Sequence, residues 1–144
     1  MFVQSVSLII PCYNEEESIP LFLETIRPIA DREPYRFEFI FINDGSSDAT
    51  PEVLRAEHAK DRRVKIINLS RNFGKEHAMA AGFHAASGDA VIPMDVDLQD
   101  PPELISSFLR RWEEGYDVVI GVRPEENGGY VLQAPVRWTF LSLF

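Results

Sequence analysis

The sequence of 144 residues contains only one cysteine, Cys12, so no disulfide can form within the chain. A lone thiol is typical of proteins kept in a reducing compartment. Residues 1–13 are apolar but have neither a basic start nor a small-residue cleavage site, so we expect no signal peptide. No uncharged run reaches the roughly 20 residues that cross a bilayer. These absences predict a soluble, cytoplasmic domain and exclude a disulfide-stapled secreted scaffold.

Positive charge is also scarce. The chain has 14 Lys and Arg against 23 Asp and Glu, a formal net charge of −9. This charge opposes binding to nucleic acid or to an anionic membrane surface, so no nucleic-acid partner is expected. An anionic ligand would need local basic groups or a metal ion. The hydrophobic content of 45% is ordinary for a globular domain, and the length suits one domain.

Short apolar runs alternate with segments whose apolar residues recur at helical spacing. The runs predict strands at 6–10, 37–42, 64–69, 90–94 and 117–122. The helical spacing predicts helices at 15–29, 49–58, 73–86 and 102–114. Such alternation predicts an α/β fold with a mainly parallel sheet and helices on both faces. Polar clusters follow the predicted strands, and ligands of such sheets bind at the carboxyl ends of the strands.

The acidic cluster "DVDLQD" follows the fourth predicted strand. Asp95, Asp97 and Gln99 stand at alternate positions and present the oxygen ligands that Mg²⁺ or Mn²⁺ prefers. A divalent ion would also relieve the repulsion between the carboxylates. The alternative is a solvated turn in which Asp100 caps a helix that starts at Pro101 or Pro102. The residues alone leave both interpretations open.

Two further clusters are equally ambiguous. In "NDGSSD", Asp44 is placed to accept hydrogen bonds from a base or ribose, but the segment also suits a plain strand–turn–helix connection. In "SRNFGKE", Arg71 and Lys75 flank a glycine before a helix, which suits either an anion site or a solvated basic loop. Neither common glycine-rich nucleotide-binding loop is present.

The order of these motifs is more specific than any one of them. "PCYNEEESI", "FINDGSSDAT" and "LSRNFGKEHAMAAGFHAASGDAVIPMDVDLQDPPELI" follow one another. The series resembles the inverting GT-A glycosyltransferases of family 2, most of all the polyprenyl-phosphate glycosyltransferases. That group includes dolichol-phosphate mannose synthases and bactoprenol glucosyltransferases. The resemblance covers residues 6–122 and implies the Rossmann-like GT-A fold.

The resemblance implies a nucleotide-sugar site, carried over position by position. Pro11, Tyr13 and Glu15 match the motif around the nucleoside. Asp44 matches the acid that reads the base, although Asn43 stands where many relatives have a second Asp. Arg71 and Lys75 match the basic loop near the donor. Asp95 is implied to contact both donor and metal. The implied metal ligands are Asp95, Asp97 and Gln99, with Val96 in place of the usual Ala.

The implied reaction is direct displacement at the anomeric carbon, with Mg²⁺ or Mn²⁺ neutralising the departing diphosphate. The sugar would move from UDP-glucose, or as second choice GDP-mannose, to a polyprenyl phosphate of the cell envelope. Residues 1–123 would form the donor part, and residues 124–144 would begin the acceptor side. In these relatives an acidic residue deprotonates the acceptor, and no residue up to Phe144 matches it. No catalytic residue is therefore assigned. We therefore expect an N-terminal fragment that binds donor without transferring sugar.

The whole protein would associate with the cytoplasmic face of the inner membrane through its missing C-terminal part, and the apolar tail would permit homo-oligomers. Two alternatives stay open. A phosphohydrolase of the haloacid-dehalogenase type also carries D-x-D after a strand, but normally after the first. A non-catalytic domain that binds nucleotide-sugars would need the donor motifs alone.

Overall fold

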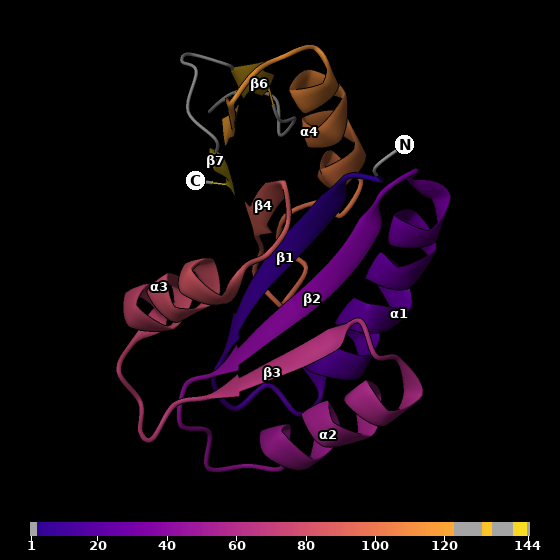
Figure 1. Cartoon of the computed structure of the whole chain (residues 1–144). Helices are drawn as coiled ribbons and strands as arrows, with labels where there is room; N and C mark the ends of the chain where they lie inside the picture. The colour runs from indigo at the N-terminus through magenta and orange to yellow at the C-terminus, as the bar shows by residue number, and fades with distance from the viewer. Residues whose placement is uncertain (1–2, 123–130, 134–139, 144) are drawn as a thin grey trace.

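The computed structural model describes residues 3–122, 131–133 and 140–143. Four parallel strands form the main sheet, and four helices connect or follow them (Figure 1). In chain order these elements are β1 (Ser5–Cys12), α1 (Ser18–Arg32), β2 (Arg36–Asn43), α2 (Thr50–Lys60), β3 (Val64–Asn68), α3 (Lys75–Ala85), β4 (Ala90–Pro93) and α4 (Leu104–Glu113). The predicted alternation of strands and helices is confirmed.

The strand order of the main sheet is β3-β2-β1-β4. The chain first builds outward from β1 to β3 and then crosses back to place β4 on the other side of β1. All three strand pairs are parallel. A parallel sheet reverses its building direction at such a point, and the loops that diverge there leave a crevice at the carboxyl edge. The topology therefore opens its crevice between the ends of β1 and β4.

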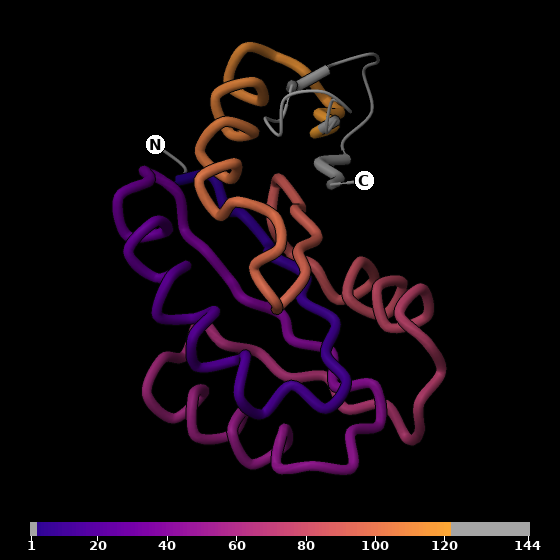
Figure 2. The backbone as a smooth tube through the Cα atoms, turned by 180° about the vertical axis from the view of Figure 1, so that it is seen from behind, coloured from indigo at the N-terminus to yellow at the C-terminus, as the bar shows by residue number. Residues whose placement is uncertain are grey.

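Helices cover both faces of this sheet, as the sequence predicts. Figures 1 and 2 show α1 and α2 on one side and α3 on the other. Because side chains alternate along a strand, Leu8 and Ile10 of β1 pack with the core under α1 and α4, whereas Ile9 packs with Ala78 of α3. Helix α3 can approach the sheet closely because Gly82 has no Cβ. A Cβ there would lie 2.4 Å from the Ile9 side chain.

The fifth predicted strand forms, but not in the main sheet. Strand β5 (Val118–Val122) pairs antiparallel with β6 (Val131–Gln133) and parallel with β7 (Phe140–Leu143). The sequence patterns did not predict β6 and β7, whose backbone groups complete both edges of β5. Apart from these two strands, the expected acceptor-side segment 124–144 lies outside the described residues, and that domain boundary stays a prediction.

The helix after the acidic cluster begins later than the sequence indicated. Helix α4 starts at Leu104 with Glu103 as its N-cap residue, and the Glu103 side chain makes no capping hydrogen bond. The predicted helix start at Pro101 or Pro102 is therefore too early: Pro101 has no regular structure, and Pro102 and Glu103 form a turn before Leu104. Among the described residues, no helix is long and apolar enough to cross a membrane.

Candidate functional site

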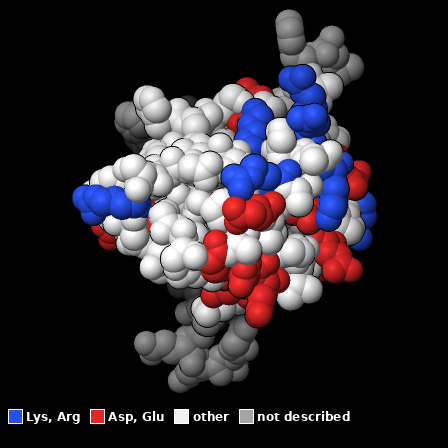
Figure 3. Space-filling view, turned by 90° about the horizontal axis from the view of Figure 1, so that it is seen from below, with Lys and Arg blue, Asp and Glu red and all other residues white. Residues whose placement is uncertain are grey.

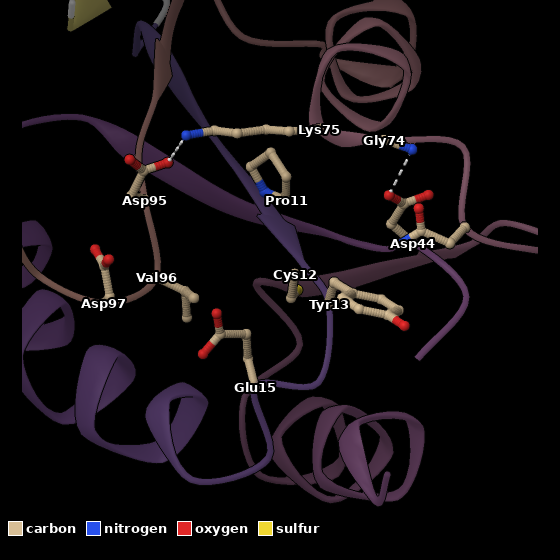
Figure 4. A pocket seen from close by; sticks show the side chains of 11 residues that line it. Pro11, Cys12, Tyr13, Glu15, Asp44, Gly74, Lys75, Asp95, Val96 and Asp97 are labelled. Carbon is tan, nitrogen blue, oxygen red and sulfur yellow. Dashed lines mark hydrogen bonds and ion pairs between the residues drawn. The ribbon is translucent and has the colours of Figure 1, made fainter. Parts of the chain in front are cut away.

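A cavity of about 400 Å³ opens at the carboxyl edge of the sheet, at the crevice between β1 and β4. Its volume lies in the ordinary range for small-molecule sites. Four segments line it: the end of β1 with the loop that follows, the end of β2, the loop before α3 and the turn after β4 (Figure 4). The lining residues are Pro11, Cys12, Tyr13, Glu15, Asp44, Asn72, Gly74, Lys75, Asp95, Val96 and Asp97.

Seven of the nine residues proposed from the sequence line this cavity: Pro11, Tyr13, Glu15, Asp44, Lys75, Asp95 and Asp97. The other two, Arg71 and Gln99, are not among the lining residues. The cavity also includes Cys12, Asn72 and Gly74, which the sequence did not single out. Residues that are up to 86 positions apart thus converge because parallel strands end at one edge of the sheet.

The loop after β1 is fixed by Asn14, which the sequence reasoning missed. Its φ of 52° lies in the left-handed region, which Asn tolerates better than most residues. Its side-chain Oδ1 accepts the backbone N–H groups of Ser47 at 2.8 Å and Asp48 at 3.3 Å. These bonds hold the backbone between Tyr13 and Glu15. The only sequence signal was an Asn between two proposed ligand-binding residues.

The start of α2 supports the same loop. The backbone N–H of Glu15 donates to the Thr50 hydroxyl at 2.9 Å, and that of Glu16 donates to Asp48 at 3.3 Å. Burial acts to raise the pKa of Asp48, but hydrogen bonds from Thr50 and Glu16 outweigh it and lower that pKa. Asp48 therefore stays ionised and serves the loop, not the cavity.

Cys12 lies at the floor of the cavity and is 3% exposed. Burial, followed by the nearby carboxylates of Glu15 and Asp48, raises the pKa of the Cys12 thiol well above its usual value. A thiol held protonated is neither a nucleophile nor a metal ligand at neutral pH. Cys12 is therefore a packing residue.

Asp44 holds the loop that carries the basic residues, here called the basic loop (residues 70–75). One carboxylate oxygen accepts the N–H of Phe73 at 2.8 Å, and the other accepts that of Gly74 at 3.0 Å. The neighbouring Gly45 has a φ of 69°, and a Cβ there would lie 2.4 Å from the backbone of Arg71. The turn after β2 and the basic loop are therefore packed backbone to backbone.

Arg71 lies outside the cavity because its guanidinium stacks on the Phe73 ring, 4.0 Å from the ring centroid. Tyr13, which lines the cavity, is 48% exposed, and Phe73, in the basic loop beside the lining residue Gly74, is 39% exposed. Exposed aromatic rings beside a cavity are suited to stacking on a planar ligand group.

The turn after β4 carries the acidic motif. Asp95 forms an ion pair with Lys75, with Oδ1 and Nζ 2.5 Å apart (Figure 4). Asp97 accepts the backbone N–H of Gln99 at 3.2 Å. Between them, Leu98 has a φ of 57°, which is uncommon for a residue other than glycine. The structure brings Asp95 and Asp97 to the cavity but does not place Gln99 there.

Negative charge predominates in the site. Among the described lining residues, Glu15, Asp44, Asp95 and Asp97 are acidic, and Lys75 is the one basic side chain. Figure 3 views the molecule from below, the side toward which β1–β3 run in Figure 1, and shows acidic side chains gathered beside basic ones. An anionic ligand here therefore needs a further cation.

The lining residues fit a divalent ion in part. Carboxylate oxygens are the ligands that Mg²⁺ and Mn²⁺ prefer, and Asp95 already accepts the ammonium cation of Lys75. Among the described residues, however, no group of three or more His, Cys, Asp or Glu side chains is placed to hold a metal. The described part of the cavity thus offers a divalent ion two carboxylates of the acidic motif, Asp95 and Asp97, which alone do not complete a metal site.

Comparison with known proteins identifies the family. The model of "Glycosyl transferase family 2" matches residues 7–143. A bactoprenol glucosyl transferase of Shigella phage SfV is 44% identical over 136 residues, which are 94% of this chain and 44% of that protein. A prophage bactoprenol glucosyl transferase homolog of Escherichia coli K12 is 42% identical over the same length and the same shares. The chain thus spans about 44% of the length of the curated relatives it matches.

Solved structures agree on the fold. A mannosyltransferase from Pyrobaculum calidifontis in complex with GDP-Man and Mn²⁺ superposes with a TM-score of 0.68 at 21% identity, over 86% of this chain and 37% of that one. Mannosyl-3-phosphoglycerate synthase from Rubrobacter xylanophilus gives 0.68 at 25% identity, over 88% of this chain and 42% of that one. The fold is of the Rossmann-like GT-A type. Since the family model matches nearly the whole chain, the chain belongs to glycosyl transferase family 2.

Proposed function

We propose that this chain provides the donor site of a metal-dependent, inverting glycosyltransferase that moves glucose from UDP-glucose to a polyprenyl phosphate. The observation that carries the proposal is the convergence of seven sequence-proposed residues on one cavity. The relatives at 44% identity, which are named bactoprenol glucosyl transferases, support a glucosyl donor and a polyprenyl acceptor. GDP-mannose is the second choice of donor. Family membership removes the phosphohydrolase alternative.

The nucleoside would bind along the loop after β1. Tyr13 offers an exposed ring for stacking on the base. Asp44 lines the cavity while both of its oxygens accept loop N–H groups. Each carboxylate oxygen can accept a second hydrogen bond, so Asp44 retains the capacity to bind a base N–H. Lys75, at the first residue of α3, would meet the diphosphate together with the positive end of the helix.

Asp95 and Asp97 would hold Mg²⁺ or Mn²⁺, and Gln99 is a further candidate ligand if the turn at Leu98 rearranges. The ion, when bound, would offset the negative charge that develops on the departing diphosphate. The protein's own part is to hold the donor so that the anomeric carbon faces an incoming phosphate oxygen. Orientation of this kind accounts for a large part of catalysis in displacement reactions.

Calorimetric titration of UDP, GDP, UDP-glucose and GDP-mannose tests the donor assignment. In the presence of Mn²⁺ we expect UDP-glucose to bind more tightly than GDP-mannose. Tighter binding of GDP-mannose would reverse the choice of donor. Failure of all four ligands to bind would contradict the proposed function.

A second assay tests the acceptor. Radiolabelled UDP-glucose is incubated with undecaprenyl phosphate and the full-length protein. Lipid-linked glucose is the expected product. Donor binding without transfer would favour a non-catalytic domain that binds nucleotide-sugars. Because polyprenyl phosphates reside in membranes, we further propose that the full-length protein works at the cytoplasmic face of the inner membrane.

A further inference from the structure

The ion pair between Lys75 and Asp95 occupies a distinctive place in the site. A second cavity of about 40 Å³ adjoins the main one, and both are lined by Pro11, Lys75 and Asp95. Figure 4 shows the Lys75 side chain extending past Pro11 to the Asp95 carboxylate. The pair therefore stands at the boundary between the two cavities, on the carboxylate where a divalent ion would bind.

We propose that Lys75 is an internal counter-ion that makes divalent-ion binding depend on the nucleotide. This inference rests on the proposed function. In the donor-free protein the Lys75 ammonium neutralises Asp95 and opposes a second cation there. The diphosphate of a bound nucleotide gives the ammonium another partner, and Asp95 then becomes available to the ion.

Charge supports this exchange. Lys75 is the one basic side chain among the described residues that line the main cavity. An ammonium 2.5 Å from Asp95 Oδ1 occupies one acceptor direction of that oxygen and places a positive charge beside the carboxylate where the ion would bind. A divalent ion beside it would also be repelled by the ammonium, since like charges in contact oppose each other strongly near a protein surface. Without nucleotide, the positive charge of Lys75 therefore lowers the affinity of the site for a divalent ion.

Exposure supports it as well. The Lys75 side chain is 57% exposed and that of Asp95 is 39% exposed. Ion pairs so open to solvent contribute little stability and separate easily. A diphosphate, with more negative charge than one carboxylate, competes well for the ammonium. The contact is thus strong enough to disfavour a lone metal ion and weak enough to open when donor arrives.

Thermodynamic linkage makes the proposal quantitative. If nucleotide raises the affinity for the ion, the ion raises the affinity for nucleotide by the same factor. Replacing Lys75 with a neutral residue should tighten binding of the ion alone and weaken binding of the nucleotide alone. The factor by which UDP strengthens Mn²⁺ binding should therefore fall. A purely structural surface ion pair would change none of these quantities in this pattern.

The test measures Mn²⁺ binding by electron paramagnetic resonance of the free ion, with and without UDP. The variants are Lys75→Gln, Lys75→Arg and, as a control of equal charge change, Lys60→Gln, whose side chain is 68% exposed on α2 and pairs with Glu57. We expect Lys75→Gln to bind Mn²⁺ alone about fivefold more tightly than the wild type, the lower end of ordinary coupling. Lys75→Arg and Lys60→Gln should resemble the wild type.

An unchanged or weaker affinity for Mn²⁺ alone in Lys75→Gln overturns the proposal, as does an equal gain in Lys60→Gln. Adding Asp95→Asn to Lys75→Gln should abolish the gain, which locates the ion at Asp95; a gain that persists also overturns it. The measurement without nucleotide is independent of the donor. Failure of UDP and GDP to bind would therefore contradict the proposed function, whereas the affinity of Lys75→Gln for Mn²⁺ alone could still be compared with that of the wild type.

Discussion

The carboxylate of Asp44 accepts the backbone N–H of Gly74 at 3.0 Å, across 30 positions of the chain. Its other oxygen accepts the N–H of Phe73 at 2.8 Å. Asp44 is 3% exposed, so these charge-assisted hydrogen bonds are largely shielded from water. One side chain at the end of β2 therefore holds the loop from which Lys75 enters the site.

We predict that Asp44→Ala weakens UDP or GDP binding while the domain stays folded. The substitution removes both loop bonds and any contact with the base. Loss of one charge-assisted hydrogen bond costs about 1.5–3 kcal/mol, which is roughly ten- to hundredfold in affinity. Titration calorimetry measures the affinity, and thermal unfolding measures the stability. A collapsed melting temperature combined with undiminished affinity would show that the turn is only structural.

Gly45 offers a test of how closely the turn and the basic loop must pack. We predict that Gly45→Ala lowers both stability and nucleotide affinity, because its Cβ would lie 2.4 Å from the backbone of Arg71 and Asn72. The matched control is Gly115→Ala, where φ is also positive at 97° but no atom lies within 4 Å of the new Cβ.

The control should lose only the strain of a left-handed alanine, about 1–2 kcal/mol, and keep its nucleotide affinity. Gly45→Ala should lose more stability than the control and bind nucleotide more weakly. Urea unfolding and calorimetry on both variants measure the two effects. Equal losses of stability and equal affinities would contradict the packing argument.

Two substitutions of Asn14 separate the effect of backbone strain in the loop after β1 from the effect of its lost side-chain hydrogen bonds. We predict that Asn14→Ala weakens nucleotide binding, because the loop that presents Tyr13 and Glu15 loses the bonds to Ser47 and Asp48. Asn14→Gly keeps the φ of 52° without strain but also loses these bonds. Both variants should bind UDP more weakly, with Asn14→Ala also less stable. Normal affinity in Asn14→Gly would assign the side chain no part in the site.

A buried carboxylate on the α3 face controls the response to acid. Burial acts to raise the pKa of Glu38, but hydrogen bonds from Lys65, Ser7 and Ser87 outweigh it and lower that pKa from 4.5 to about 2. Glu38 is 8% exposed and joins β2 to the residues just before β4. Because the pKa is lower in the folded state, its stabilisation is present above pH 4.5 and is lost as the pH falls toward 2.

We predict that this group alone makes the free energy of unfolding fall by about 3 kcal/mol over that range. Glu38→Gln should be less stable than the wild type at pH 7, and the difference should shrink as the pH falls from 4.5 to about 2. Burial acts to raise the pKa of the Asp61 carboxyl, but hydrogen bonds from Arg63 and Arg27 outweigh it and lower that pKa to about 2; this group titrates in both proteins and cancels in the comparison. Denaturant unfolding at several pH values measures the free energy of unfolding of both proteins. A difference in this free energy that does not change with pH would contradict the prediction.

The local patterns of the sequence predicted most of the fold. Every expected strand and helix forms, because buried apolar runs and helical spacing respond to short-range geometry. The position of β5 could not be predicted, since it pairs with β6 and β7, two strands that the sequence patterns did not indicate. The predicted start of α4 at Pro102 was two residues early, because Pro102 and Glu103 form a turn before the first helical residue, Leu104.

Seven of the nine residues proposed from the sequence line one cavity, but the contacts that these residues make were not predicted. Motif order identified seven residues of the cavity, whereas the spacing of Asp44 gave no hint that it bonds to the basic loop. The left-handed φ of 57° at Leu98 also turns the chain before Gln99, which strand-like alternation did not indicate. Arg71 stacks on Phe73 instead of lining the cavity. Such outcomes depend on tertiary geometry that residue types alone do not encode.

If the cavity binds a nucleoside diphosphate together with a divalent ion at Asp95 and Asp97, nucleotide affinity must depend on that ion and on Asp97. The most direct measurement is calorimetric titration of UDP, and of GDP in parallel, with Mn²⁺ or with chelator, into the wild type and Asp97→Ala. Glu52→Ala on α2, a carboxylate 64% exposed, is the charge-matched control. We predict nucleotide binding to the wild type and the control with Mn²⁺, and its loss in chelator and in Asp97→Ala. Unchanged nucleotide affinity in chelator, or in Asp97→Ala, would contradict the account.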